Sequence, residues 1–303
     1  MRRIFVVTAL VIIVLIIAII IAVSRLGGQS SSSMNYINDL RELLINGSFT
    51  AMYYENATYV TIGSNMHYET NEHLIDYMSI GFINGSRAFV RIINVVNITN
   101  PLYTTPPIVQ GFAYWISAPE ELCMANYIVM YSGRNGAIID CLTQVKPNAS
   151  ALLLTYLPFN EFLGNYALNM SYGSGYLNQY NESYAEVIHI KYINESSWHG
   201  ETTYCYNVTT MTKTIMINEL LPKANYTTLE NTTEIICLLP NGIATTQVIH
   251  DTLITLINGN EIAKVISVAD RQLMNYTLNY FNTTAFNELI LMRKARKVVN
   301  RVV

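Results

Sequence analysis

Few residues of this chain have both the types and the spacing that metal or acid–base chemistry requires. The segment HYETNEH places His67 and His73 around Glu69 and Glu72, and all four side chains are potential metal ligands. Their spacing matches neither the histidine pair of a helical zinc site nor a zinc finger, so the segment is interpreted as a solvated loop. His189 alternates with apolar residues in VIHIKYI and is expected on the face of a strand.

Catalytic motifs are also sparse. Glu120 and Glu121 form a carboxylate pair, but they follow Ser117 in a capping-box pattern, where the dipole of a helix favours acidic residues without any catalytic role. The chain contains no nucleophile elbow, no phosphate-binding loop and no dinucleotide-binding fingerprint. We therefore predict a non-enzymatic protein with no catalytic residues, no metal and no other cofactor.

The four cysteines indicate disulfide bonds. Their number is even, and sequence alone allows three connectivities. Local spacing favours Cys123 with Cys141 and Cys205 with Cys237, with no cysteine left as a nucleophile. A zinc site is disfavoured because no Cys-x-x-Cys pair occurs. Disulfides persist in oxidising compartments, so we expect the domain to be exported.

Residues 4–23 are apolar apart from Thr8, and as a helix they would span about 30 Å, the thickness of a membrane core. Two arginines precede this segment, so residues 1–3 are predicted to be cytoplasmic and the remainder extracellular. A cleaved secretory signal is the alternative, but its apolar region is usually shorter. We predict a transmembrane anchor over residues 4–24, a Gly/Ser linker over 25–34, and a single-pass protein of the cell membrane.

Asn-x-Ser/Thr triplets are unusually frequent. Charged residues make up only 13% of the chain, against about 25% in an ordinary soluble protein, and glycans would compensate for this deficit. Chance would place about five of the 31 asparagines in such triplets. An Asn- and Thr-rich composition alone is the competing explanation. The thirteen predicted acceptors are Asn46, Asn56, Asn84, Asn97, Asn148, Asn169, Asn181, Asn194, Asn207, Asn225, Asn231, Asn275 and Asn282.

The predicted fold is α+β: after the transmembrane helix, an antiparallel, hairpin-rich sheet that could form a half-barrel, with covering helices, in one disulfide-stapled domain over 35–283. Asn84-Gly85 and Asn258-Gly259 separate strand-like runs and predict hairpin turns. A short helix is expected over LRELLI, residues 40–45. Further helices are predicted over 118–131, 159–170 and 214–221.

The C-terminal segment, residues 284–303, predicts a basic amphipathic helix. Ala285, Leu289 and Met292 begin an apolar stripe at helical spacing. Residues 35–290 hold 10 basic and 21 acidic residues, a net charge of 10 − 21 = −11, so the helix could pack on its own acidic body. Binding to an anionic membrane surface or to a partner are the alternatives. The basic residues are Arg293, Lys294, Arg296, Lys297 and Arg301.

The strand-like run GSFTAMYY (47–54) follows the short helix and precedes successive hairpins. This order resembles the outer-membrane lipoprotein carriers and related sorting proteins, over about residues 35–270. The resemblance implies an antiparallel half-barrel that holds a lipid chain against covering helices, although such carriers lack thirteen glycan acceptors. We expect a binding or accessory role at the cell surface, with a lipid-binding half-barrel or a structural subunit as alternatives. The expected partners are the membrane, through the spanning helix, and a lipid or a surface protein, but no nucleic acid.

Overall fold

A computed structural model describes residues 35–63, 66–99, 108–118, 121–130, 135–143, 153, 157, 159–163, 169–174, 178–218 and 225–290 of the chain. Within these residues one α-helix precedes twelve strands, and one 3₁₀ helix lies between the sixth and seventh strands. The elements are α3 (Asn35–Asn46), β1 (Phe49–Gly63), β2 (Met66–Ile83), β3 (Ser86–Thr99), β4 (Ile108–Ala118), β5 (Glu121–Met130), β6 (Asn135–Thr143), η1 (Asn160–Leu163), β7 (Asn169–Ser174), β8 (Asn178–Trp198), β9 (Glu201–Asn218), β10 (Asn225–Leu238), β11 (Ala244–Ile257) and β12 (Asn260–Leu278). Residues 283–290 are also helical.

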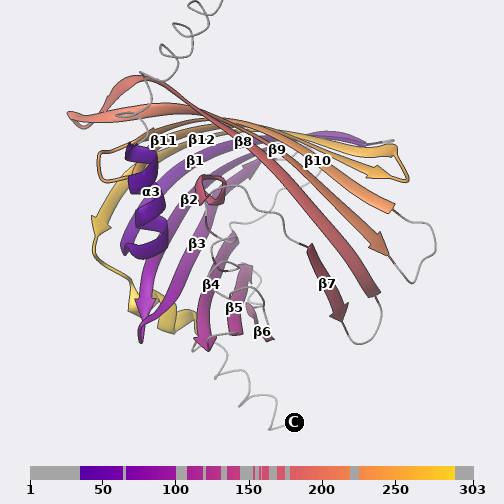
Figure 1. Cartoon of the computed structure of the whole chain (residues 1–303), viewed down its shortest axis with the longest axis horizontal. Helices are drawn as coiled ribbons and strands as arrows, with labels where there is room; N and C mark the ends of the chain where they lie inside the picture. Colours follow the sequence, from indigo (N-terminus) through magenta and orange to yellow (C-terminus); the bar gives the residue numbers. More distant parts are fainter. Residues whose placement is uncertain are drawn as a thin grey trace, which may run out of the picture.

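All twelve strands form one antiparallel sheet in the order β6-β5-β4-β3-β2-β1-β12-β11-β10-β9-β8-β7. Strands β1 to β6 follow one another from the middle of the sheet to one edge. Strands β7 to β12 follow one another from the other edge back to the middle, where β12 pairs with β1. The sheet is strongly curved, and α3 lies on its concave side (Figure 1). Strands β6 and β7 are the two edges.

Tight turns set the register of the hairpins. Asn84-Gly85 and Asn258-Gly259 have positive φ at both residues, 51° and 78° in the first pair and 51° and 83° in the second. This is the turn whose twist matches that of the flanking strands, so both predicted hairpins are confirmed. His199-Gly200 makes the same turn between β8 and β9, with φ values of 49° and 86°.

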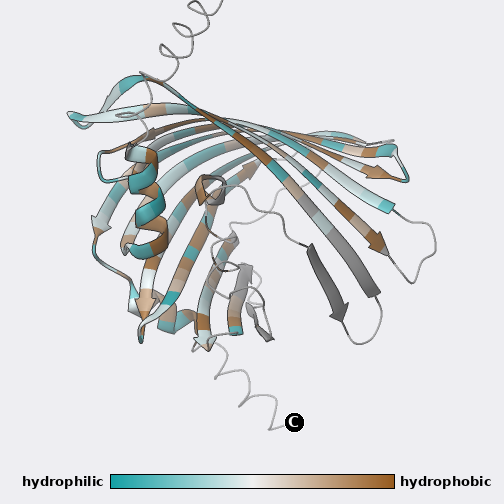
Figure 2. Cartoon of the chain, in the orientation of Figure 1, coloured by the Kyte–Doolittle hydropathy of each residue, from teal (hydrophilic) through white to brown (hydrophobic). Residues whose placement is uncertain are grey.

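The core lies between α3, η1 and the concave face of the sheet. Apolar and polar residues alternate along many strands, as expected where one face packs on a core (Figure 2). Helix α3 is confirmed and buries one apolar stripe, Ile37, Leu40 and Leu44, each 1% exposed. These side chains pack in one cluster with Phe49, Tyr53, Met78, Ile80, Phe89, Leu122, Leu153, Phe159, Phe162, Tyr206, Ile236 and Leu238.

Two polar contacts fix α3 on the sheet. The Arg87 guanidinium donates hydrogen bonds to the carbonyl oxygens of Leu43 and Leu44 in the last turn of the helix and of Gly47 just after it. Burial lowers the pKa of Arg87 to about 10. The second contact joins α3 to η1, where the Arg41 Nε donates a hydrogen bond to the carbonyl oxygen of Phe162.

The convex face carries a smaller core. Residues 283–290 pack Phe286 and Leu289, both 3% exposed, against Ala88, Val90 and Ala113 of β3 and β4. The described start of the C-terminal helix therefore packs on its own domain. The basic residues that follow, from Arg293 to Arg301, lie outside the described residues.

The predicted α+β class is wrong, because strands dominate the described chain. The segments predicted as helices at 118–131 and 214–221 belong largely to β5 and β9, and the described residues of 159–170 form the short η1 and the start of β7. The predicted capping box paired Ser117 with Glu120, which lies outside the described residues; in the structure the Ser117 hydroxyl donates to the Glu121 carboxylate across the β4–β5 connection. Continuous pairing of β9 with both β8 and β10 likewise overrides any local helical preference.

Within the described residues, no helix has both the length and the apolar character needed to cross a membrane. This finding contradicts the localisation predicted from the sequence, a single-pass protein of the cell membrane with an extracellular C-terminal domain. Residues 1–3, 4–24 and 25–34, on which that prediction was based, lie outside the described residues.

Candidate functional site

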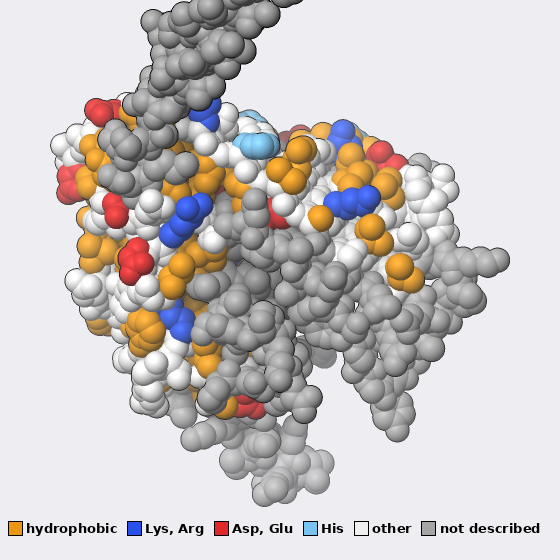
Figure 3. Space-filling view, viewed as in Figure 1, with side chains coloured by type: hydrophobic (Ala, Val, Ile, Leu, Met, Phe, Trp, Pro, Cys, Tyr) orange, Lys and Arg blue, Asp and Glu red, His pale blue; other side chains and the backbone are white. Residues whose placement is uncertain are grey.

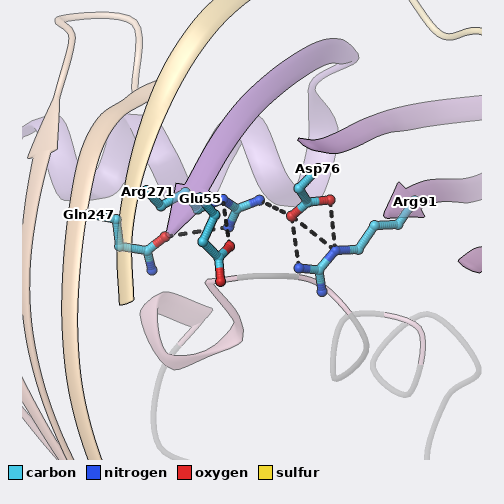
Figure 4. Close-up of polar contacts among 5 residues, drawn as sticks. All are labelled: Glu55, Asp76, Arg91, Gln247 and Arg271. Atoms are coloured by element: carbon cyan, nitrogen blue, oxygen red, sulfur yellow. Dashed lines mark hydrogen bonds and ion pairs between the residues drawn. The ribbon is translucent and has the colours of Figure 1, made fainter. Parts of the chain in front are cut away.

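A cluster of charged and polar side chains crosses the middle of the concave face. Glu55 of β1, Asp76 of β2, Arg91 of β3, Gln247 of β11 and Arg271 of β12 point toward one another (Figure 4). These five strands are consecutive in the sheet, so the cluster joins its two halves across the β1–β12 pair. Alternation along each strand places all five side chains on the face that α3 covers.

Asp76 is the centre of this cluster. Its side chain is fully buried and receives hydrogen bonds from Arg91, with Nε–Oδ1 at 3.0 Å and Nη2–Oδ2 at 2.8 Å. The Arg271 Nη2 donates to the same Oδ2 atom. Burial by itself would raise the pKa of Asp76, but the charges of Arg271 and Arg91 outweigh it, and the net direction is downward.

Arg271 is almost fully buried and is surrounded on several sides. Its Nη1 donates to the Gln247 Oε1 at 3.4 Å, and its Nε lies 3.8 Å from the Glu55 Oε2. Its guanidinium carbon lies 4.2 Å from the ring centroid of Tyr53 and 5.4 Å from that of Phe159. The two carboxylates thus balance the buried charge of Arg271, and the two rings stabilise it further through cation–π contacts. These contacts indicate a structural role for Arg271.

Further carboxylates lie on the concave face beyond this cluster, toward the strand ends that are farther from α3. The part of the face that carries Glu72, Glu186, Glu230 and Asp251 is called the distal concave face. Strand register places Glu186, Thr212 and Glu230 in one row across β8, β9 and β10. In a neighbouring row, Asp251 accepts a hydrogen bond from the Thr232 hydroxyl at 3.0 Å. The eight described carboxylates of the concave face are Glu55, Glu72, Asp76, Glu186, Glu195, Glu230, Glu234 and Asp251.

These carboxylates make the distal concave face acidic. Burial raises the pKa of Glu72, Asp251 and Glu55, and for Glu55 the nearby Arg271 opposes this rise only in part. Burial and the charges of Glu72 and Glu55 also raise the pKa of Tyr59 to about 12. Among the described residues, the only basic side chains on this face are those of Arg87, Arg91 and Arg271. Arg87 binds α3, and the other two bind Asp76.

Within the described part of the chain, no group of side chains offers a usable set of metal ligands. One group there brings potential ligand atoms close together, Glu121 with Cys123 and Cys141, but both cysteines are in a disulfide and cannot act as thiolates. The residues of HYETNEH lie in strand β2 instead of the predicted loop. His73 contacts the Asn56 Oδ1, His67 is exposed, and Glu69 and Glu72 point to opposite faces.

The predicted disulfides, Cys123–Cys141 and Cys205–Cys237, are confirmed. Each joins residues that are directly opposite on neighbouring strands, β5 with β6 and β9 with β10. Cys123 was predicted on a helix and lies on a strand. His189 is on a strand as expected, where it is exposed on the convex face. Glu120 lies outside the described residues.

The predicted glycan acceptors differ in accessibility. Asn207 and Asn282 are half-buried, and the side chains of Asn148, Asn169 and Asn181 lie outside the described residues. The exposed acceptors are Asn46, Asn56, Asn84, Asn97, Asn194, Asn225, Asn231 and Asn275. Glycosylation stays a prediction at all thirteen positions, and among the described side chains these eight are the most accessible.

No family model and no curated protein matches the chain. Among solved structures, the chain is similar to a DUF1329 family protein from Desulfovibrio piger, with 6% sequence identity, a TM-score of 0.26, and coverage of 82% of this chain and 93% of that one. It is also similar to OccK8 (OprE) from Pseudomonas aeruginosa, with 10% identity, a TM-score of 0.24 and coverage of 75% and 98%. A third is the COG4313 outer membrane channel from Pseudomonas putida F1, with 5% identity, a TM-score of 0.22 and coverage of 76% and 96%.

Scores this low carry no argument about function. The resemblance to lipoprotein carriers therefore rests on build alone, a curved antiparallel sheet with a helix on its concave side. The acidic concave face was missed by the sequence reading, because its carboxylates are scattered between residues 55 and 251 and only strand register brings them to one face.

Proposed function

We propose that this protein is a non-enzymatic binding protein, and that its ligand lies on the distal concave face of the sheet and carries several positive charges. The observation that supports this most is the excess of carboxylates there. Eight described acidic side chains face the concave side, whereas that face has three described arginines, which contact Asp76 or α3. A cationic ligand would be attracted to a surface with this excess of acidic side chains.

The spacing of the carboxylates favours an extended ligand over a single metal ion. Glu186 and Glu230 are separated by strand β9, which places their backbones about 10 Å apart. Among the described residues, no three carboxylates of the concave face come within the distance that one ion would require. Threonine hydroxyls between them, such as those of Thr212 and Thr232, offer hydrogen-bond acceptors to ammonium groups.

A lipid or other apolar ligand is the second candidate. Ile249, Leu253 and Val265 are half-buried on the same face and would accept an alkyl chain. The described concave surface under α3, however, is a filled core whose buried members are each at most 4% exposed. A purely apolar ligand would therefore have to lie among the carboxylates, which would lose hydration without gaining a partner.

Calorimetric titration of the full chain with spermine and, separately, with oleate tests the proposal. We expect spermine to bind with an affinity that falls as salt rises, and the double variant Glu186→Gln/Glu230→Gln to weaken it at least tenfold. The matched control is Glu69→Gln/Glu201→Gln, which removes two exposed carboxylates from the convex face. Equal affinity in both double variants, or binding of oleate alone, would overturn the proposal.

A further inference from the structure

The predicted glycan acceptors within strands share one face of the sheet. Side chains alternate between the faces along a strand, so register with buried neighbours identifies the face of each acceptor. Asn56 lies between Glu55 and Ala57 of the concave side, and Asn207 lies between Tyr206 and Val208 of that side. By the same reasoning every strand-borne acceptor with a described side chain faces the convex side: Asn56, Asn97, Asn194, Asn207, Asn225, Asn231 and Asn275.

Chance does not readily produce this arrangement. If each strand position faced either side equally, seven acceptors would share the convex face about once in a hundred cases. The concave face is also polar in its distal half, where Thr210 lies opposite Thr232 and Thr212 lies in the next row, so polarity alone does not confine asparagine to one side.

Exposed apolar side chains lie directly beside three of these acceptors. Large hydrophobic residues on a surface are normal when they are scattered singly. Three of the exposed ones in this protein, however, are direct cross-strand partners of acceptors, with Cβ atoms about 5 Å apart. Hydrophobic and basic side chains gather over the region of β8 and β9 in Figure 3. The pairs are Asn207 with Ile235, 44% exposed; Asn225 with Ile217, 49% exposed; and Asn231 with Met211, 48% exposed.

We propose that the convex face is N-glycosylated, and that the glycans on Asn207, Asn225 and Asn231 cover the apolar side chains opposite them. The first sugar of an N-linked glycan is attached to the side-chain nitrogen of asparagine, within reach of the neighbouring strand. The glycans then leave the acidic concave face open. This inference depends on the convex face only, and it holds whether or not a cationic ligand binds on the other side.

One acceptor sequence supplies an internal control. Asn282 begins the C-terminal helix, where its Oδ1 accepts a hydrogen bond from the backbone N–H of Ala285 at 3.0 Å. Its Nδ2, the atom that would carry the glycan, donates to the Tyr77 hydroxyl at 2.6 Å. A glycan at this position would remove that contact and disturb the packing of Phe286, so Asn282 is excluded from the modified set.

Glycopeptide mass spectrometry of the full chain, purified from the cells that naturally produce it, tests the assignment. We expect glycan on Asn207, Asn225 and Asn231 and none on Asn282. Unmodified peptides at all three convex positions, or a glycan on Asn282, would overturn the proposal. These outcomes do not depend on any ligand titration, so failure here is distinguishable from failure of the proposed binding function.

A variant series tests the covering role. Removing the three acceptors by Asn207→Gln, Asn225→Gln and Asn231→Gln should raise the fluorescence of an apolar-surface dye at least twofold and promote self-association in sedimentation velocity. Adding Met211→Thr, Ile217→Thr and Ile235→Thr to that background should return both readings to the glycosylated level. The single variant Asn46→Gln, at the exposed end of α3, is the control and should change neither. No rise in the triple variant would refute the covering role.

Discussion

Replacement of Asp76 by asparagine is the most informative test of the concave cluster. The substitution keeps the shape of the side chain but removes the charge that Arg91 and Arg271 share. Removing one partner of a buried ion pair costs about 3–5 kcal/mol, because an uncompensated charge stays buried. At about 2–4 °C per kcal/mol for a domain of this size, the melting temperature should fall by about 6–20 °C.

The effect should depend on pH in a defined direction. The pKa of Asp76 is lowered in the folded protein, so its contribution to stability is present above the unfolded pKa, about 3.9, and is lost as the pH falls through the lower folded pKa. The difference between wild type and Asp76→Asn should therefore shrink below about pH 4. Thermal unfolding followed by circular dichroism between pH 3 and pH 8 measures both quantities.

Two comparisons sharpen this test. Glu69→Gln removes an exposed carboxylate from the same strand and should change stability by less than about 0.5 kcal/mol. The triple variant Asp76→Leu/Arg91→Leu/Arg271→Met replaces the three central ionic groups by apolar ones and should recover most of the loss. A cost below about 1 kcal/mol for Asp76→Asn at pH 7 would refute the view that this cluster is a buried, coupled unit.

Three other perturbations have expected outcomes. Burial raises the folded pKa of Glu72, so its charged form is unfavourable, and Glu72→Gln should raise the melting temperature at pH 7 but not at pH 4; a fall at pH 7 would contradict this. Gly242→Ala should destabilise more than Gly259→Ala in urea unfolding: both glycines have φ near +84°, but only at Gly242 would a Cβ lie 2.6 Å from the backbone of α3, and equal costs would refute the reasoning. Replacing Cys205 and Cys237 by serine should cost about 3 kcal/mol in the same assay, and an unchanged urea midpoint would contradict that contribution.

The sequence predicted those features that depend on neighbouring residues. The Asn-Gly turns, the helix over 40–45 and both disulfides follow from short-range chemistry, and the structure confirms them. The helices predicted over 118–131 and 214–221 were wrong because the competing signal, pairing with a strand on each side, is not local. The His199-Gly200 turn was missed because His-Gly is not one of the dipeptides that usually signal this type of turn.

The concave site could not be predicted, for a related reason. Asp76 and Arg271 lie 195 residues apart in the chain and meet only because β12 returns to pair with β1. No periodic pattern marks such a contact. The acceptor sequences were visible as a population, but their confinement to one face needed the register of each strand.

A crystal structure of the full chain with spermine bound is the most direct test of the proposed binding function. We expect the ligand on the distal concave face, with ammonium nitrogens within about 4 Å of the Glu186 and Glu230 carboxylates. Spermine found only beside exposed carboxylates of the convex face, such as Glu69 or Glu201, would contradict the account.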